Sequence, residues 1–130
     1  MLKAELLEII ANGENSVVEF KRDDLKPEQL AREIVAFANA YGGKIFIGVE
    51  DDGVISGLRH TNTEEWTLNV FRDKVYPQLI PLYEEVQTDS DKKVAVITVP
   101  MGTSKPYVLR HNESEQIFIR IASRTQKTGR

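Results

Sequence analysis

Apolar residues along the first third of the chain recur at helical spacing in two places. Residues 2–11 place leucine and isoleucine on one side of a short amphipathic helix. A longer helix is predicted after Pro27, where proline suits the first helical position. From Leu30 to Tyr41 the apolar positions follow the i, i+4, i+7, i+8, i+11 pattern of one buried stripe, and Gly42 ends it.

A third helix is predicted after residue 60. Thr61–Glu64 has the order of a capping box, which satisfies free N–H groups at a helix start. Leu68, Phe71 and Val75 follow at helical spacing, so we expect them to face the core. Pro77 is expected to end this helix.

The residues around Phe20 alternate between apolar and charged, which is typical of a strand. Side chains two residues apart in a strand lie on the same face. Val18 and Phe20 are therefore predicted to be buried together. Glu19 and Lys21 are predicted to share the opposite, exposed face.

Further strands are predicted in pairs connected by short turns. The pairs are residues 44–50 with 54–55, 82–88 with 93–99, and 107–110 with 116–121. Strands that pair mostly as hairpins, together with two main helices and a short N-terminal one, predict an α+β fold with a mixed, mainly antiparallel sheet. The length of 130 residues suits one domain over residues 1–130, and residues after 121 are expected to be coil.

Charge is distributed unevenly along the chain. The net charge is −3, but residues 1–104 carry 11 Lys/Arg and 18 Asp/Glu (−7), whereas residues 105–130 carry 6 and 2 (+4). A basic C-terminal quarter is typical of a nucleic-acid contact or, equally, of a solvated tail. The absence of cysteine excludes disulfides and thiolate metal sites and fits a cytoplasmic location. No apolar run approaches the roughly 20 residues of a membrane helix, so no membrane partner is expected.

Acidic residues accompany the strand that carries Glu19 and Lys21. A carboxylate that holds a divalent cation beside a lysine suits a metal-dependent phosphodiesterase, although such a pair is also common on solvated strands. Glu14 precedes the strand, and Asp51 follows the central strand, where side chains reach a ligand. Asp51 is about as well explained by the turn at Gly53, because aspartate is favoured in turns.

Four motifs occur in a specific order. They are Glu14-(4)-Glu19-Phe20-Lys21, Phe37–Gly43, Ile47–Gly53 and Ile119–Thr125. In this order they resemble the Schlafen AlbA-type domain over nearly the whole chain. The resemblance implies an α+β fold related to archaeal Alba chromatin proteins. It also implies a DNA-binding role at the N-terminus of transcriptional regulators, often followed by a C-terminal winged-helix domain.

The family also includes Schlafen proteins that cleave structured RNA with three carboxylates. Glu14, Glu19 and Asp51 fall on those positions, and Lys21 follows in the same motif. The resemblance thus implies a possible catalytic and metal site that would use Mg²⁺ or Mn²⁺. The catalytic relatives pair two such lobes, so activity would require a homodimer.

The basic C-terminal segment supplies the candidate nucleic-acid contacts. Arg120 lies between two isoleucines and is therefore expected to point away from the core. Basic side chains neutralise phosphates, and hydroxyls add hydrogen bonds. The candidates are Arg120, Ser123, Arg124, Thr125, Lys127 and Arg130.

Three functions are compatible with the sequence. The leading hypothesis is nucleic-acid binding, with DNA favoured over RNA, in a transcriptional regulator. The alternatives are a metal-dependent endoribonuclease and a dimerisation module without nucleic-acid contact. The acidic body favours the dimerisation module over DNA binding on the sheet face, because negative charge repels the phosphate backbone.

Overall fold

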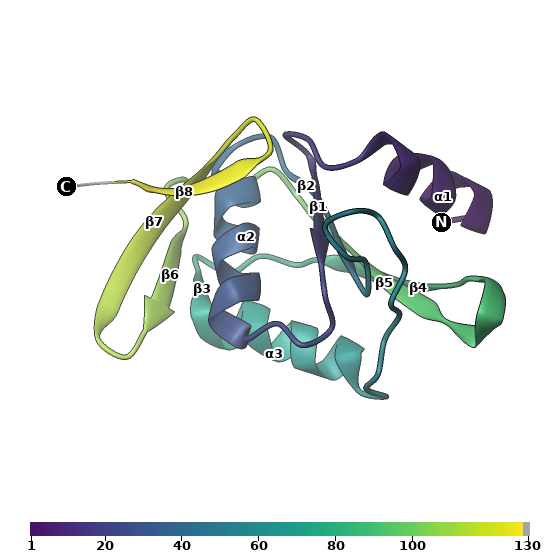
Figure 1. Cartoon of the computed structure of the whole chain (residues 1–130). Coiled ribbons are helices and arrows are strands. Elements are labelled where there is room, and N and C mark those ends of the chain that lie inside the picture. Colours follow the sequence, from purple (N-terminus) through teal and green to yellow (C-terminus); the bar gives the residue numbers. More distant parts are fainter. Residues whose placement is uncertain (129–130) are drawn as a thin grey trace.

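Two four-stranded sheets enclose a central helix in the computed structural model, which describes residues 1–128 (Figure 1). The elements in chain order are α1 (Lys3–Asn12), β1 (Val18–Lys21), α2 (Pro27–Asn39), β2 (Gly43–Ile47), α3 (Thr63–Lys74), β3 (Val75–Tyr76), β4 (Leu82–Gln87), the 3₁₀ turn η1 (Asp89–Asp91), β5 (Lys93–Val99), β6 (Val108–His111), β7 (Ser114–Ile121) and β8 (Arg124–Thr128). The α+β prediction is confirmed.

The first sheet has the strand order β1-β2-β5-β4. β1 and β2 are parallel and are joined through α2, whereas the other pairs are antiparallel. α1 covers one face of this sheet, where Phe20 and Phe46 meet edge to face with ring centroids 6.1 Å apart. The predicted burial of Val18 and Phe20 is confirmed.

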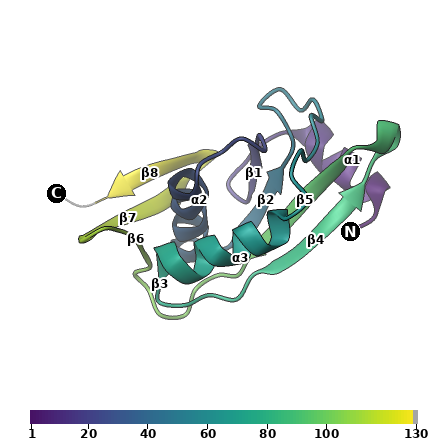
Figure 2. The same ribbon diagram turned by 90° about the horizontal axis from the view of Figure 1, so that it is seen from below.

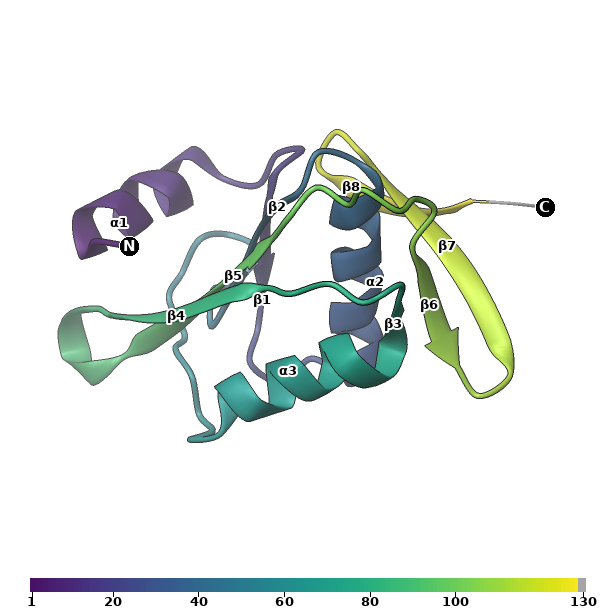
Figure 3. The same cartoon turned by 180° about the vertical axis from the view of Figure 1, so that it is seen from behind.

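The second sheet has the order β3-β6-β7-β8 and is antiparallel. It packs on the side of α2 that faces away from the first sheet, as the view from behind shows (Figure 3). α3 packs beside α2, seen from below in Figure 2. The main apolar core therefore lies around α2, with contributions from both sheets and α3.

Asn39, the last residue of α2, fixes the second sheet to this helix. Its amide nitrogen donates to the carbonyl oxygens of Tyr107 (2.9 Å) and Phe118 (3.0 Å), and its Oδ1 accepts the N–H of Tyr107 (2.7 Å). From its place just before Tyr41 and Gly42, Asn39 is expected by sequence to cap the end of its own helix. The structure shows a bridge between two elements instead.

Several sequence expectations differ from the structure. Tyr41 lies beyond the end of α2 and is 83% exposed, and Leu68 lies on the outer side of α3. α3 begins at Thr63 as expected, but no side chain caps it. Residues 124–128 form strand β8 rather than coil, because they complete a hairpin with β7. No helix within residues 1–128 is long and apolar enough to cross a bilayer.

Candidate functional site: a buried charge network beside a basic hairpin

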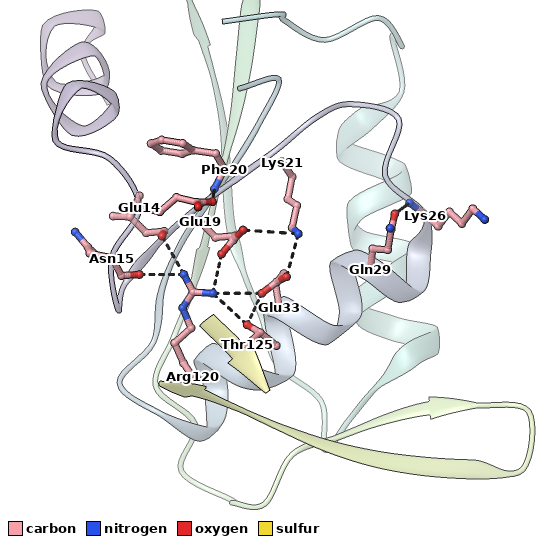
Figure 4. Close-up of polar contacts among 11 residues, drawn as sticks. Glu14, Asn15, Glu19, Phe20, Lys21, Lys26, Gln29, Glu33, Arg120 and Thr125 are labelled. Atoms are coloured by element: carbon pink, nitrogen blue, oxygen red, sulfur yellow. Dashed lines mark hydrogen bonds and ion pairs between the residues drawn. The ribbon is translucent and has the colours of Figure 1, made fainter. Parts of the chain in front are cut away.

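Four charged side chains meet in the interior between the two sheets (Figure 4). Arg120 Nη1 lies 2.7 Å from Glu19 Oε1 and 3.5 Å from Glu33 Oε1. Lys21 Nζ lies 3.1 Å from Glu33 Oε2 and 3.6 Å from Glu19 Oε2. Each carboxylate therefore has both cations as partners.

Strand alternation places two of these charges in the interior. The apolar side chains of β1 turn towards α1, so Glu19 and Lys21 turn towards α2 and the second sheet. They share a face, as predicted, but this face is not exposed. Glu19 is only 8% exposed and Lys21 is partly buried, because α2 and the β7–β8 hairpin cover them.

Arg120 also lies in the interior, contrary to the sequence expectation. Its side chain is 1% exposed. Residues of β7 alternate between a face towards α2 and an outer face, and Arg120 is on the same inner face as Phe118. Its guanidinium carbon lies 4.8 Å from the centre of the Phe37 ring. Its Nε has no hydrogen-bond partner within residues 1–128.

The same network closes the free edge of β1. Arg120 Nη2 donates to the carbonyl oxygens of Asn15 (2.9 Å) and Val18 (3.1 Å). On the same strand, Glu14 Oε2 accepts the N–H of Phe20 at 2.8 Å. An edge strand with open N–H and C=O groups invites pairing with other chains. Side chains therefore satisfy part of the edge that no strand covers.

Thr125 joins β8 to the network. Its hydroxyl donates to Glu33 Oε1 and accepts from Arg120 Nη1 at 3.1 Å. Thr125 is also the cross-strand partner of Arg120. In the turn between the two strands, Ala122 has φ 52°, in the left-handed region that favours glycine. Ala122 therefore adopts a backbone conformation that glycine would adopt more easily.

When Glu14, which lies against Glu19, is counted with the network, three carboxylates face the two cations. The pKa of Glu19 is raised from 4.5 to about 8, first by burial, then by its contact with the Glu14 carboxyl and the charge of Glu33. The hydrogen bond from Arg120 acts in the opposite direction. Burial lowers the pKa of Lys21, but the carboxylates of Glu33 and Glu19 more than offset this, and the net shift is upward. A proton on Glu19 balances the cluster at neutral pH.

The three expected metal ligands are only partly brought together. Glu14 and Glu19 lie against each other, whereas Asp51 is an exposed residue of the turn after β2. No group of three or more Asp, Glu or His side chains within residues 1–128 is arranged to hold a metal ion. Glu33, which the sequence analysis missed, takes part instead. In the sequence, the pattern that could have pointed to Glu33 is its position directly beside the apolar stripe of α2.

The expected nucleic-acid contacts divide into two groups. Arg120 and Thr125 belong to the interior network. Ser123, Arg124 and Lys127 are exposed on the β7–β8 hairpin. Arg130 lies outside the residues that the structure describes.

Comparison with known proteins agrees with this architecture. Residues 14–129 match the model of the Schlafen, AlbA_2 family. The chain belongs to the Schlafen AlbA_2 family. The N-terminal domain of a RecG-related protein from Nitrosomonas europaea has a similar fold, with a TM-score of 0.67 and 21% identity over 92% of this chain and 88% of that one. The DIP2311 protein of Corynebacterium diphtheriae has a TM-score of 0.66 and 19% identity over 98% of this chain. The Schlafen AlbA_2 chain spans 26% of the DIP2311 chain.

The first prediction concerns Arg120. Replacing it in the variant Arg120→Met removes one of the two cations that Glu19 and Glu33 share, together with the donors to the carbonyl oxygens at the edge of β1. We expect a loss of about 3–5 kcal/mol in unfolding free energy. The measurement is urea unfolding at pH 7. Arg124→Met on the exposed turn is the matched control and should stay within about 0.5 kcal/mol of the wild type. A loss in Arg120→Met as small as that expected for the control would show that the network does not stabilise the fold.

The second prediction concerns pH. Folded Glu19 holds its proton more tightly than unfolded Glu19, so its contribution to stability is fully present below pH 4.5 and is lost as pH rises towards 8. For one proton the slope approaches about 1.4 kcal/mol per pH unit. Glu19→Gln cannot ionise and should flatten this slope in urea unfolding between pH 5 and 8. Glu5→Gln, on the exposed side of α1, should keep the wild-type slope. The reverse result would assign the pH dependence to another group.

Proposed function

We propose that this Schlafen AlbA_2 domain binds nucleic acid through the β7–β8 hairpin. The observation that carries the proposal is the pair Arg124 and Lys127, both exposed and without a carboxylate partner within residues 1–128. Some other exposed cations have a carboxylate partner, such as Arg72 with Asp73 and Arg110 with Glu115. An unpaired surface cation is available to replace counterions on a phosphate backbone.

Arg32 of α2 extends this basic surface. Its guanidinium carbon lies 5.5 Å from the centre of the Phe118 ring. Phe118 and Lys127 are cross-strand partners, so they share a face of the sheet. Arg32 and Lys127 therefore lie on the same side of the hairpin, and Arg124 lies on its other side, next to the turn. We refer to Arg32, Arg124 and Lys127 together as the basic hairpin surface. The periodicity of the sequence did not predict that Arg32 on α2 would lie beside the C-terminal segment.

Similarity to other proteins supports DNA as the ligand and a transcriptional regulator as the protein in which this domain acts. The solved relative from Nitrosomonas europaea is named for its relation to RecG, an ATP-dependent DNA helicase. Schlafen AlbA-type domains resemble Alba chromatin proteins and occur with winged-helix domains in regulators. The body of the chain is acidic, so attraction to phosphates is restricted to a local surface. We therefore propose positioning on the DNA backbone rather than direct reading of bases by the hairpin.

The third prediction is a salt titration of oligonucleotide affinity. The double variant Arg124→Ala/Lys127→Ala should bind more weakly, and the slope of log affinity against log salt should flatten by about 0.7–0.9 for each lost contact. Fluorescence anisotropy with labelled double- and single-stranded DNA and RNA measures both quantities. Tighter binding of RNA than of DNA would contradict the proposed preference.

The matched control removes two cations from the other end of the molecule. Lys92→Ala/Lys93→Ala changes the net charge by the same amount at the β4–β5 hairpin, far from β8 in Figure 1. It should leave the salt slope unchanged. Equal effects of the two double variants would show that binding depends on the net charge of the domain and not on the position of these cations. If neither double variant changes oligonucleotide affinity, the basic hairpin surface is only solvated and does not bind nucleic acid. That result is expected for a dimerisation module.

A metal-dependent endoribonuclease is the second candidate, and one observation favours it. Glu14 and Glu19 lie against each other beside Lys21, and burial, followed by the contact with Glu14, raises the pKa of Glu19. A divalent cation such as Mg²⁺ or Mn²⁺ at these carboxylates would relieve their repulsion. Asp51 would complete the set only by moving towards them, and a second copy of the chain would supply the other half of an RNA clamp.

The fourth prediction separates this candidate from simple binding. If a cation binds Glu14 and Glu19, Mn²⁺ should raise the melting temperature, because a ligand bound only to the folded state stabilises it. Glu19→Gln should abolish the shift and any cleavage of structured RNA, whereas Glu5→Gln should keep both. Differential scanning fluorimetry and a gel assay measure them. Oligonucleotide binding with neither a cation-dependent shift nor cleavage would exclude the nuclease.

A further inference from the structure

A cavity of about 500 Å³ lies between the β1–α2 connection and the N-terminal end of α3. It is lined by Asp23, Asp24, Leu25, His60, Asn62, Thr63 and Trp66. None of these residues belongs to the charge network or to the basic hairpin surface. The volume is within the range of about 300–1,000 Å³ that is typical of small-molecule sites.

An aromatic and an aliphatic side chain provide the apolar part of the wall. Trp66 and Leu25 are both partly buried and pack against the main core. Packing of this kind restricts the indole ring. A restricted, half-exposed aromatic ring is a surface on which a planar ligand can stack.

His60 is oriented by a buried carboxylate. The Asp23 side chain is 6% exposed and accepts the backbone N–H groups of Arg59 (2.5 Å) and His60 (3.3 Å). Its Oδ2 also lies 3.0 Å from His60 Nδ1. The hydrogen of a neutral imidazole therefore resides on Nδ1, which leaves Nε2 as an acceptor.

The two carboxylates that line the cavity already have partners. The Asp23 carboxylate is already hydrogen-bonded to three N–H groups, and Asp24 Oδ2 is 3.2 Å from Arg22 Nη2. A strongly cationic ligand would therefore find its counter-charges already engaged. The carboxylate of Asp24 and the Nε2 of His60 still accept hydrogen bonds from a neutral group.

We propose that the cavity takes one unstacked guanine base of a bound single strand, an inference that rests on the proposed nucleic-acid function. Guanine is planar and carries adjacent N–H donors on its Watson–Crick edge, which suits a carboxylate acceptor beside a stacking ring. Phosphates remain outside, where Arg22 and Arg59 are exposed at the rim. The basic hairpin surface would then provide affinity, and this cavity would provide base preference.

Trp66 is the single tryptophan of the chain, so its fluorescence reports on the cavity directly. The fifth prediction is that guanosine quenches this emission in a saturable way, and adenosine and cytidine do so much more weakly. Asp24→Asn should weaken guanosine binding by roughly tenfold or more, because it removes a charged acceptor from the base edge. Asp52→Asn, an exposed residue of the turn after β2, is the matched control and should bind like the wild type.

Several outcomes would overturn this inference. They are no saturable quenching by any nucleoside, equal quenching by all of them, an unchanged affinity in Asp24→Asn, and stronger quenching by spermidine, which would identify a cation site. The Arg124→Ala/Lys127→Ala variant should bind guanosine normally while its oligonucleotide salt slope flattens. If guanosine binds but no oligonucleotide does, the nucleic-acid function fails and the cavity remains a guanine site.

Discussion

The position of the Arg120 guanidinium between two sheets is the constraint on which the rest of the domain depends. It pairs with Glu19 on β1 and Glu33 on α2, and it donates to backbone carbonyls at the edge of β1. A buried ion pair needs further hydrogen bonds to offset its desolvation, and both Nη nitrogens of Arg120 have partners, although its Nε has none within residues 1–128. The second sheet is therefore held to the first by a directional contact, whereas apolar packing alone would allow it to slide.

The network also decides which parts of the family motifs reach solvent. Glu19 and Lys21, which look like a surface site in the sequence, are covered by the hairpin that carries Arg120. The same alternation that turns Arg120 and Thr125 inward leaves Arg124 exposed. Arg124 thus lies on the side of the hairpin opposite the buried charges, whereas Lys127 is on the same side as Thr125 but is exposed.

Two features of the surface divide the work of recognition in the function we propose. The basic hairpin surface presents exposed positive charges, which suit contacts with phosphates that do not depend on base sequence. The cavity beside Trp66 combines an aromatic ring with hydrogen-bond acceptors, which suits a base. Their separation allows each to be altered without changing the other, and neither requires the buried carboxylates to open.

Periodicity and turn residues by themselves determined most of the secondary structure. The alternation around Phe20, the stripe from Leu30, and the 82–88 and 93–99 hairpin depend on neighbours in sequence, and all three are present. The ordered motifs also determined the family. Local patterns carry this information because helices and strands repeat every few residues.

Only the tertiary structure decided where the charges lie. Arg120 and Glu33 are 87 positions apart, and each looks like a surface residue within its own element. Their burial follows from the second sheet packing against α2, which no local repeat encodes. The same holds for His60 and Asp23, whose contact requires the β1–α2 connection to meet the start of α3. A charge is buried only when a distant partner compensates it, so its environment depends on the whole fold.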